Sequence, residues 1–347
     1  MAARKRILDR NKLRTQSVRK RRSKVGIREE ATPVPPGSSF SQFLQSMPKT
    51  WAAADVNAVI GAWSTAWGRG RTVLWGFGAH LIKVGLAPIV VDLMERGAIG
   101  GLMTNGAACV HDLELAMLGR TSEDVGPALD DGNFGMARET AQHLNEAISG
   151  GAAQGIGMGE AVGRAILESD YPYSDRSVLA AAVRLGIPAT VHTAIGTDIH
   201  HMHPSADGAA LGATSYRDFE TLAALVSGLQ RGVLFNIGSA VILPEVFLKA
   251  LSLARNLGHR VDNFTTVDMD FVRQYRPRVN IVERPTRGGG RGISLVGHHE
   301  IMVPLLAAGV IEVHSGVEAQ PKKKPRGRQS KLKGSSQRSS GRVKEKK

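Results

Sequence analysis

The feature that most constrains the fold of this chain is the alternation of short apolar runs with longer segments of helical periodicity. The short runs are rich in β-branched residues and have the length of strands, whereas the longer segments repeat apolar residues every three to four positions. We predict strands at residues 72–75, 99–103, 189–192, 233–237, 263–267 and 279–282. We predict the clearest helices at residues 81–95, 134–148, 216–229 and 245–257. This order requires crossover connections, so it predicts an α/β fold with a mostly parallel sheet and helices on both faces.

Charge divides the chain into three parts. Residues 1–30 carry 12 Lys and Arg against 3 acids and residues 320–347 carry 12 against 1, so with a net charge of +14 the intervening residues carry −6. The basic ends contain few apolar residues and cannot bury enough surface to offset the entropy of ordering. A Pro, Gly and Ser linker separates the first of them from the first apolar pattern. We therefore predict a disordered basic arm with its linker at 1–38, one α/β domain at 39–316, and a disordered basic tail at 317–347.

The basic ends favour non-specific electrostatic binding of nucleic acid. A solubilising extension explains them equally well, because they carry no aromatic or base-reading signature. Cys109 is the only cysteine, which excludes an intrachain disulfide, and charged residues interrupt the most apolar window, residues 81–94. We therefore predict a cytoplasmic protein without a membrane partner.

The loops after the predicted strands share one composition. They read GFGAH (76–80), TNGA (104–107), HTAIGTD (192–198), NIGSA (236–240) and TTVD (265–268). Glycine and alanine allow a backbone to approach a ligand closely, and Thr, Ser, Asn and Asp exchange hydrogen bonds with it. Because the carboxyl ends of parallel strands meet at one edge of the sheet, the loops together predict a ligand crevice there. A single Gly-x-Gly such as Gly76 and Gly78 would be a weak signal by itself.

A group of histidines raises the question of a metal site. His192, Asp198, His200, His201 and His203 lie within twelve residues. A zinc site needs three or four convergent ligands, and neighbouring histidines on an extended segment point to opposite faces. The sequence has no HExxH or CxxC spacing. We therefore predict no metal.

At these loops the sequence resembles the deoxyhypusine synthase family, whose members bind NAD and transfer an aminobutyl group from spermidine to a protein lysine. The best stretches are residues 74–118, 186–198, 238–243 and 302–309. The resemblance implies a Rossmann-like NAD-binding fold and a homotetramer with sites shared across a dimer interface. It implies NAD contacts from Gly78, Ala79, His80, Thr104, Asn105, Gly106, Gly238, Ser239, Thr265, Thr266, Asp268, Gly297 and His298.

The sequence departs from the family where the family has a lysine that forms an imine, a little before the final helix. Residues 283–299 offer Arg284, Arg287 and Arg291 there, and arginine remains protonated and cannot act as that nucleophile. Lys249, the only lysine between residues 243 and 309, lies on a predicted helix well ahead of the expected place. Standard imine chemistry therefore lacks its residue.

These observations predict an NAD-dependent protein of the deoxyhypusine synthase type that acts on a polyamine or another small amine. The reaction is aminobutyl transfer, with a protein substrate, or amine oxidation. His111, His201 or His203 is the candidate base, and Asp112 or Asp198 would orient a histidine or the amine. The catalytic candidates are thus His111, Asp112, Asp198, His201 and Lys249. The alternative is a non-catalytic oligomeric scaffold of the same fold whose basic ends bind RNA or a ribosome.

Overall fold

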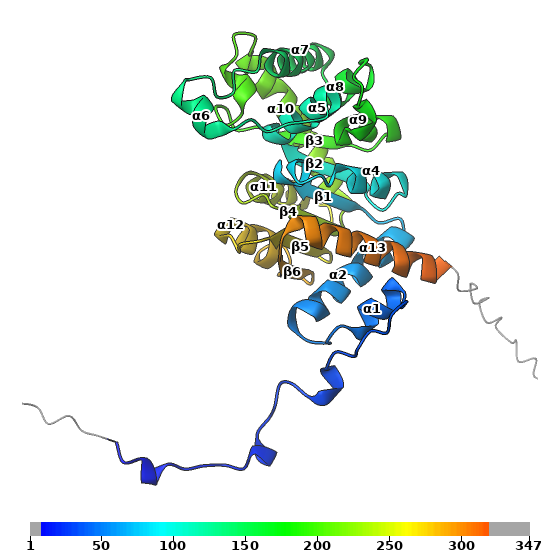
Figure 1. The fold of residues 1–347 in the computed structure, drawn as a ribbon, viewed down its shortest axis with the longest axis vertical. Helices are drawn as coiled ribbons and strands as arrows, with labels where there is room; N and C mark the ends of the chain where they lie inside the picture. The colour runs from blue at the N-terminus through cyan, green and yellow to red at the C-terminus, as the bar shows by residue number, and fades with distance from the viewer. Residues whose placement is uncertain (1–7, 319–347) are drawn as a thin grey trace, which may run out of the picture.

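The computed structural model describes residues 8–318, and six strands form one sheet at its centre (Figure 1). The strands are β1 Val73–Phe77, β2 Gly101–Asn105, β3 Ala189–His192, β4 Val233–Ile237, β5 Thr265–Asp270 and β6 Arg291–Val296. Their order is β3-β2-β1-β4-β5-β6 and all neighbouring pairs are parallel. The predicted α/β class is confirmed. The order reverses between β1 and β4, as in doubly wound dinucleotide-binding sheets, whose ligands bind at this switch point.

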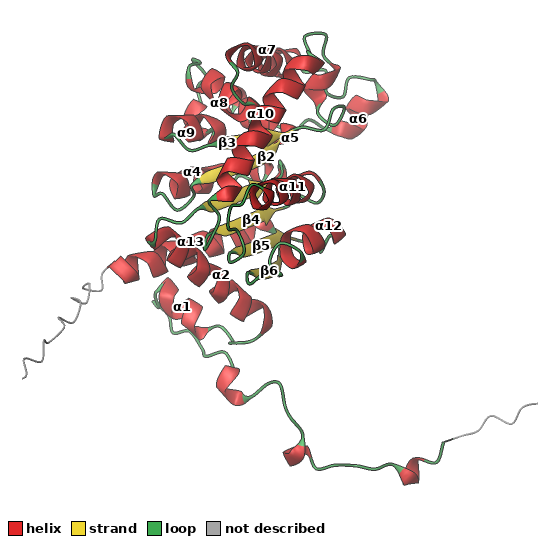
Figure 2. Ribbon diagram, turned by 180° about the vertical axis from the view of Figure 1, so that it is seen from behind, coloured by secondary structure: helices red, strands yellow, loops and turns green. Residues whose placement is uncertain are grey.

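Helices cover both faces of the sheet (Figures 1 and 2). Side chains alternate between the faces along each strand. Trp75 and Phe235 pack on Trp63 of α2 (Trp51–Gly68), whereas Leu74 and Leu234 join a second apolar cluster with Phe247 of α11 (Ile242–Asn256). The first face also carries α4 (Ala87–Glu95) and α13 (His299–Glu318), and the second carries α10 (Gly208–Ser227).

The other helices are α1 Phe40–Ser46, α3 His80–Lys83, α5 Gly106–Leu118, α6 Val125–Asp130, α7 Arg138–Gln154, α8 Met158–Leu167, α9 Val178–Leu185 and α12 Tyr275–Pro277. The helix predicted at residues 81–95 is divided into α3 and α4, because Gly85 takes a left-handed φ of 80°. The break leaves Lys83 at the end of a separate short helix. None of the helices in residues 8–318 combines the length and the apolar character needed to cross a bilayer.

Strand boundaries correct several sequence-based expectations. β3 and β4 have the predicted bounds, but β1, β2 and β5 continue two or three residues further toward their carboxyl ends. Their last residues include Thr104 and Asp268, which are polar and yet buried because each is hydrogen-bonded within the sheet region. Residues that we expected in loops are thus part of the sheet.

The predicted strand at residues 279–282 is wrong. This segment belongs to a wide helical turn, Arg278–Glu283, because a short apolar run by itself does not distinguish a buried strand from a buried helix. The sixth strand is instead β6, at the edge of the sheet, where Ile293 and Leu295 are buried and Arg291 and Val296 are exposed.

The amino-terminal arm runs away from the domain as an extended segment with three short turns (Figure 1). Arg10–Lys12, Val18–Lys20 and Ile27–Glu29 form these turns and bury no residue. Two backbone hydrogen bonds attach the end of the arm near α1, from Lys49 N to Glu29 O at 3.0 Å and from Thr32 N to Ser46 O at 2.9 Å. The predicted disordered ends also include residues 1–7 and 319–347, which lie outside the described part of the chain.

Candidate functional site

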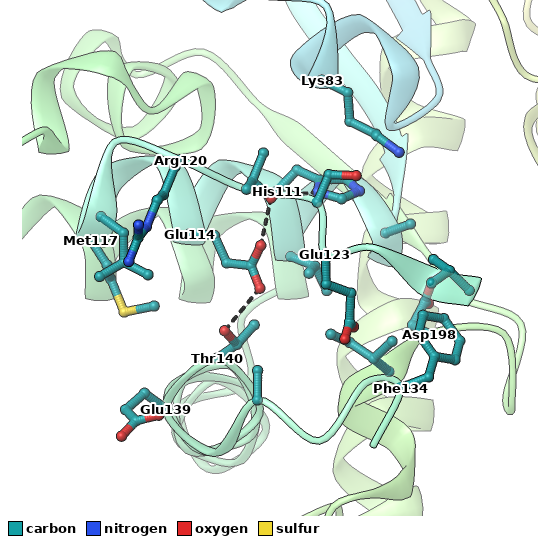
Figure 3. A pocket seen from close by; sticks show the side chains of 18 of the residues that line it. Lys83, His111, Glu114, Met117, Arg120, Glu123, Phe134, Glu139, Thr140 and Asp198 are labelled. Carbon is teal, nitrogen blue, oxygen red and sulfur yellow. Dashed lines mark hydrogen bonds between the residues drawn. The ribbon is translucent and has the colours of Figure 1, made fainter. Parts of the chain in front are cut away.

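A cavity of about 670 Å³ lies at the carboxyl edge of the sheet, between α5 and α7 (Figure 3). Helix α5 follows β2 directly, and α3, which follows β1, brings Lys83 to the wall. The loop after β3 contributes residues 197–199, and the segment between α5 and α7 covers the remaining side. Its volume is within the range of small-molecule sites. Its polar side chains include Lys83, His111, Glu114, Arg120, Glu123 and Asp198.

A hydrogen-bonded chain fixes His111 on this wall (Figure 3). His111 Nδ1 lies 2.6 Å from Thr121 Oγ1, which donates to Glu114 Oε2 at 2.5 Å, and Thr140 Oγ1 donates to Glu114 Oε1 at 3.0 Å. A threonine hydroxyl has one proton, and an ionised carboxylate only accepts. Thr121 must therefore accept from His111 Nδ1–H. In the neutral ring this leaves the lone pair on Nε2, as a general base requires.

The surroundings of His111 favour the neutral ring. Burial lowers its pKa below the ordinary histidine value, the positive charge of Lys83 lowers it further, and Glu114 acts in the opposite direction. His111 is consequently uncharged at neutral pH and can accept a proton.

Glu114, Thr121 and Lys83 line the cavity and were not among the residues predicted from the sequence. The spacing of His111 and Glu114, three residues apart on one helix, places them on one face and could have predicted their proximity. Thr121 lies beyond the left-handed Gly119 that ends α5, so its contact with His111 depends on how the chain turns back. Lys83 is the lysine that lines the cavity.

Asp112, predicted to be catalytic, faces away from His111. It is buried and accepts hydrogen bonds from Ser177 Oγ at 2.6 Å, Val178 N at 2.9 Å and Leu179 N at 3.1 Å. These bonds satisfy the amino end of α9. Burial raises the pKa of Asp112 and the three bonds oppose that shift. Successive helical residues point roughly 100° apart, which explains why Asp112 and His111 have different surroundings.

Asp198 lies where the cavity meets the amino end of α5. Its carboxyl group lies against the backbone at Gly106, and burial is the main cause that raises its pKa. A side chain at Gly106 would overlap this carboxylate, so this glycine is required by the close approach. The positive end of the α5 dipole thus already holds an anion from the protein itself.

His201 pairs with Asp198 behind the cavity wall. His201 Nε2 is 3.9 Å from Asp198 Oδ2, and His201 Nδ1 accepts from Gly196 N at 3.1 Å and from Asp198 N at 3.3 Å. Of this pair only Asp198 lines the cavity. His203 is further out and interacts with Ser205 at 2.7 Å. His111 is therefore the candidate base that the structure brings to the cavity.

Asp198, His200 and His201 offer donor atoms within 4.8 Å of one another, the arrangement that a metal would need. Nδ1 of His201 accepts two backbone protons, so the ring proton of neutral His201 is on Nε2, which then cannot be a ligand. His200 donates from Nδ1 to Asn145 Oδ1 at 2.9 Å and keeps a free lone pair on Nε2, and burial lowers its pKa to about 4. Asp198 and His200 remain as possible ligands. A structural zinc site uses four protein ligands and a catalytic zinc site uses three, so this group is too small for either.

Part of the predicted NAD set meets at the switch point between β1 and β4. A side chain at Gly78 would come within 3.0 Å of Gly238 O, and one at Gly238, whose φ is 67°, within 2.5 Å of the His299 ring. The rings of His80 and His299 are 5.4 Å apart. The loops that meet here also contain Ala79, Ser239, Gly297 and His298.

The other predicted NAD residues are bonded inside the protein or lie at the opposite end of a strand. Thr104 Oγ1 donates to Phe77 O at 2.7 Å inside the sheet, and Asn105 caps α5 by accepting from Ala108 N at 3.2 Å. Thr265 and Thr266 stand at the amino end of β5, opposite to the loops, because the strand runs through them. Asp268 is buried against Asn236 at 2.9 Å, and burial raises its pKa to about 6.

Lys249, the remaining catalytic candidate, does not line the cavity. It is exposed on α11 and paired with Glu245 one turn earlier. Lys249 therefore does not replace the imine-forming lysine that the deoxyhypusine synthase family has and this sequence lacks.

The chain is a doubly wound α/β protein with a cavity of ligand size at the carboxyl edge of its sheet. No family model matches the sequence, and no curated protein matches it. Solved structures match in fold. A LOR/SDH protein of Methanococcus maripaludis S2 has 15% identity over 81% of this chain and 74% of that one, with a TM-score of 0.49. A protein assigned as a deoxyhypusine synthase of Entamoeba histolytica has 11% identity. The match covers 82% of this chain and 97% of that protein, with a TM-score of 0.48.

The chain spans about a third of two other matched proteins. The cyanobacterial arginine dihydrolase ArgZ has 14% identity over 77% of this chain and 33% of its own, with a TM-score of 0.46. AgrE, in complex with ornithine and NAD⁺, has 17% identity. The match covers 76% of this chain and 34% of AgrE, with a TM-score of 0.47. At these identities the similarity concerns the fold and does not show membership of a family.

Proposed function

We propose that this chain is an NAD-dependent protein, similar in type to deoxyhypusine synthase, that oxidises a small amine with His111 as the base. The observation that carries the proposal is the position of an uncharged, oriented imidazole in a ligand-sized cavity whose wall includes Lys83 of α3, the helix that follows β1 at the switch point. Sheets with this strand order bind dinucleotides at that point. An amine is charged at neutral pH and must lose a proton before its neighbouring carbon can give up a hydride, so a base is required.

The residues at the switch point fit a dinucleotide in part. Gly78 and Gly238 allow a close approach of the two backbones, and Ala79, His80, Ser239 and His298 surround them. Two helix amino ends do not fit its phosphates, because Asp198 occupies that of α5 and Glu245 is in the first turn of α11. We therefore place NAD against the loops after β1, β4 and β6, and not against Thr104, Asn105 and Gly106.

The two parts of the proposed site are neighbours. His80 and Lys83 are the first and last residues of α3, and four helical residues span about 6 Å. A substrate in the cavity is then close to the switch point, where bound NAD would supply the hydride acceptor. His111 Nε2 accepts the ammonium proton, and Thr121 with Glu114 stabilises the imidazolium that forms.

Amine oxidation is preferred to aminobutyl transfer because Lys249 is outside the cavity. Transfer through an imine would require Lys83, the lysine on the cavity wall. A polyamine, a protein substrate and a homotetramer belong to this second, less supported reaction.

Addition of NAD is expected to raise the melting temperature of the purified protein. A ligand that binds only the native state at 100 times its Kd adds about 2.7 kcal/mol to the free energy of unfolding. Thermal unfolding followed by circular dichroism over a series of NAD concentrations measures the effect, and ATP, which lacks the nicotinamide, serves as the control. An unchanged melting temperature up to millimolar NAD would refute the proposed cofactor.

A further inference from the structure

Two cations on the cavity wall have no partner within the described part of the chain. The side chains of Lys83 and Arg120 form neither an ion pair nor a hydrogen bond with any group of residues 8–318. Some exposed arginines elsewhere pair with an acid one turn away, as Arg96 does with Asp92 at 2.8 Å. Both side chains are exposed at the cavity wall, and their charges are free to meet a ligand.

The carboxylates of the same wall are already engaged by the protein. Glu114 accepts from Thr121 and Thr140, and Asp198 lies against the backbone at the amino end of α5. Glu123 Oε1 accepts from Gly135 N at 2.9 Å, and Glu139 pairs with Arg138 at 2.9 Å. A ligand thus meets acids that already accept hydrogen bonds from the protein, and two cations whose donors make no hydrogen bond within residues 8–318.

Lys83 and Arg120 occupy different sides of the cavity. Figure 3 shows Lys83 extending toward His111, with Asp198 and Glu123 on the same side, and Arg120 beyond Glu114 next to Met117. Two unit charges of the same sign 4 Å apart repel by about 1 kcal/mol in water and about 4 kcal/mol near a protein surface. A ligand that carries only ammonium groups would be repelled by Lys83, whereas a carboxylate would be attracted to it.

We propose that the substrate of this site is an amino acid, an amine that also bears a carboxylate, and that Lys83 binds the carboxylate. This inference rests on the proposed amine-oxidising function and specifies its substrate class. Lys83 is preferred to Arg120 because it shares its side of the cavity with His111, so that a carboxylate on Lys83 leaves the amine of a short substrate near the base. Asp198 and Glu123 lie on the same side of the cavity. In this proposal they orient the ammonium group of the substrate before it loses its proton.

The test compares matched ligands that differ by one carboxylate. Calorimetry without NAD measures binding of lysine against cadaverine and of 4-aminobutanoate against butylamine. We expect the wild-type protein to bind each carboxylate-bearing member at least about tenfold more tightly. Lys83→Met should abolish the preference, Lys83→Arg should retain most of it, and Arg120→Gln should leave it unchanged. Lys49→Met removes the same charge from an exposed position between α1 and α2 and is the matched control.

A second measurement, the pKa of His111, responds to the charge near Lys83 and does not depend on the stability of the protein. A carboxylate bound to Lys83 offsets the charge that lowers the pKa of His111, so an NMR titration of His111 should shift upward with 4-aminobutanoate and not with butylamine. Equal binding of the matched ligands, no binding of either, or a preference that survives Lys83→Met would overturn the proposal. NADH formation is assayed separately, so selective binding without NADH would reject the oxidation and retain the ligand class.

Discussion

Replacement of His111 by Ala is expected to lower kcat/KM for amine oxidation by about 10²- to 10⁴-fold, the usual contribution of a positioned general base. The imidazole of His111 lines the cavity, and its free nitrogen can take the ammonium proton. Initial rates of NADH formation measure the effect. The folded state should tolerate the change, since His111 is only half-buried and bonded to one hydroxyl.

Variants of the supporting residues separate a base from a merely structural histidine. Thr121→Val and Glu114→Gln should each reduce kcat/KM by less than His111→Ala, because the imidazole remains but loses its orientation and its stabilising charge. His259→Ala changes an exposed histidine after α11 and should have wild-type rates. If His111→Ala retained half of the wild-type activity, the assignment of the base would be wrong.

Replacement of Asp112 by Ala should reduce the free energy of unfolding by about 2–4 kcal/mol, the loss expected when a buried charged acceptor is removed from several donors. Ser177, Val178 and Leu179 would each keep a buried donor without its present partner at the start of α9. Denaturant unfolding measures the change, and Asp130→Ala, at an exposed site at the end of α6, is the control.

The same variant tests whether Asp112 has a catalytic role. Activity per folded molecule should remain at the wild-type level, since Asp112 does not line the cavity. Loss of activity without loss of stability would return Asp112 to the list of catalytic candidates.

Most of the sheet could be predicted from the sequence because strands β1 to β5, including β3 at one edge, are buried almost throughout. β3 and β4 are continuous buried runs, and both have the predicted bounds. β6 was missed because it is a half-exposed edge strand that begins with Arg291 and Gly292, which indicate a loop. β2 and β5 end later than predicted because hydrogen bonds inside the sheet compensate for burying Thr104 and Asp268.

The candidate site could be predicted only where residues close in sequence form it. His111 was assigned from the family resemblance and Asp198 from the loop after a predicted strand, and both line the cavity. Lys83 was not assigned, because the predicted continuous helix concealed the break at Gly85 that separates α3. Contacts of Thr121 and Thr140 with Glu114 depend on the fold of the segment between α5 and α7, which has no periodic pattern that fixes it.

The protonation of His111 in the free protein tests the central claim most directly. Nitrogen-15 NMR of the imidazole ring over a pH series distinguishes the two neutral tautomers and gives the pKa. The structure predicts a proton on Nδ1, a free lone pair on Nε2, and a pKa below the ordinary value of about 6.5. A proton on Nε2, or a pKa above that value, would contradict the account of His111 as a base that faces the cavity.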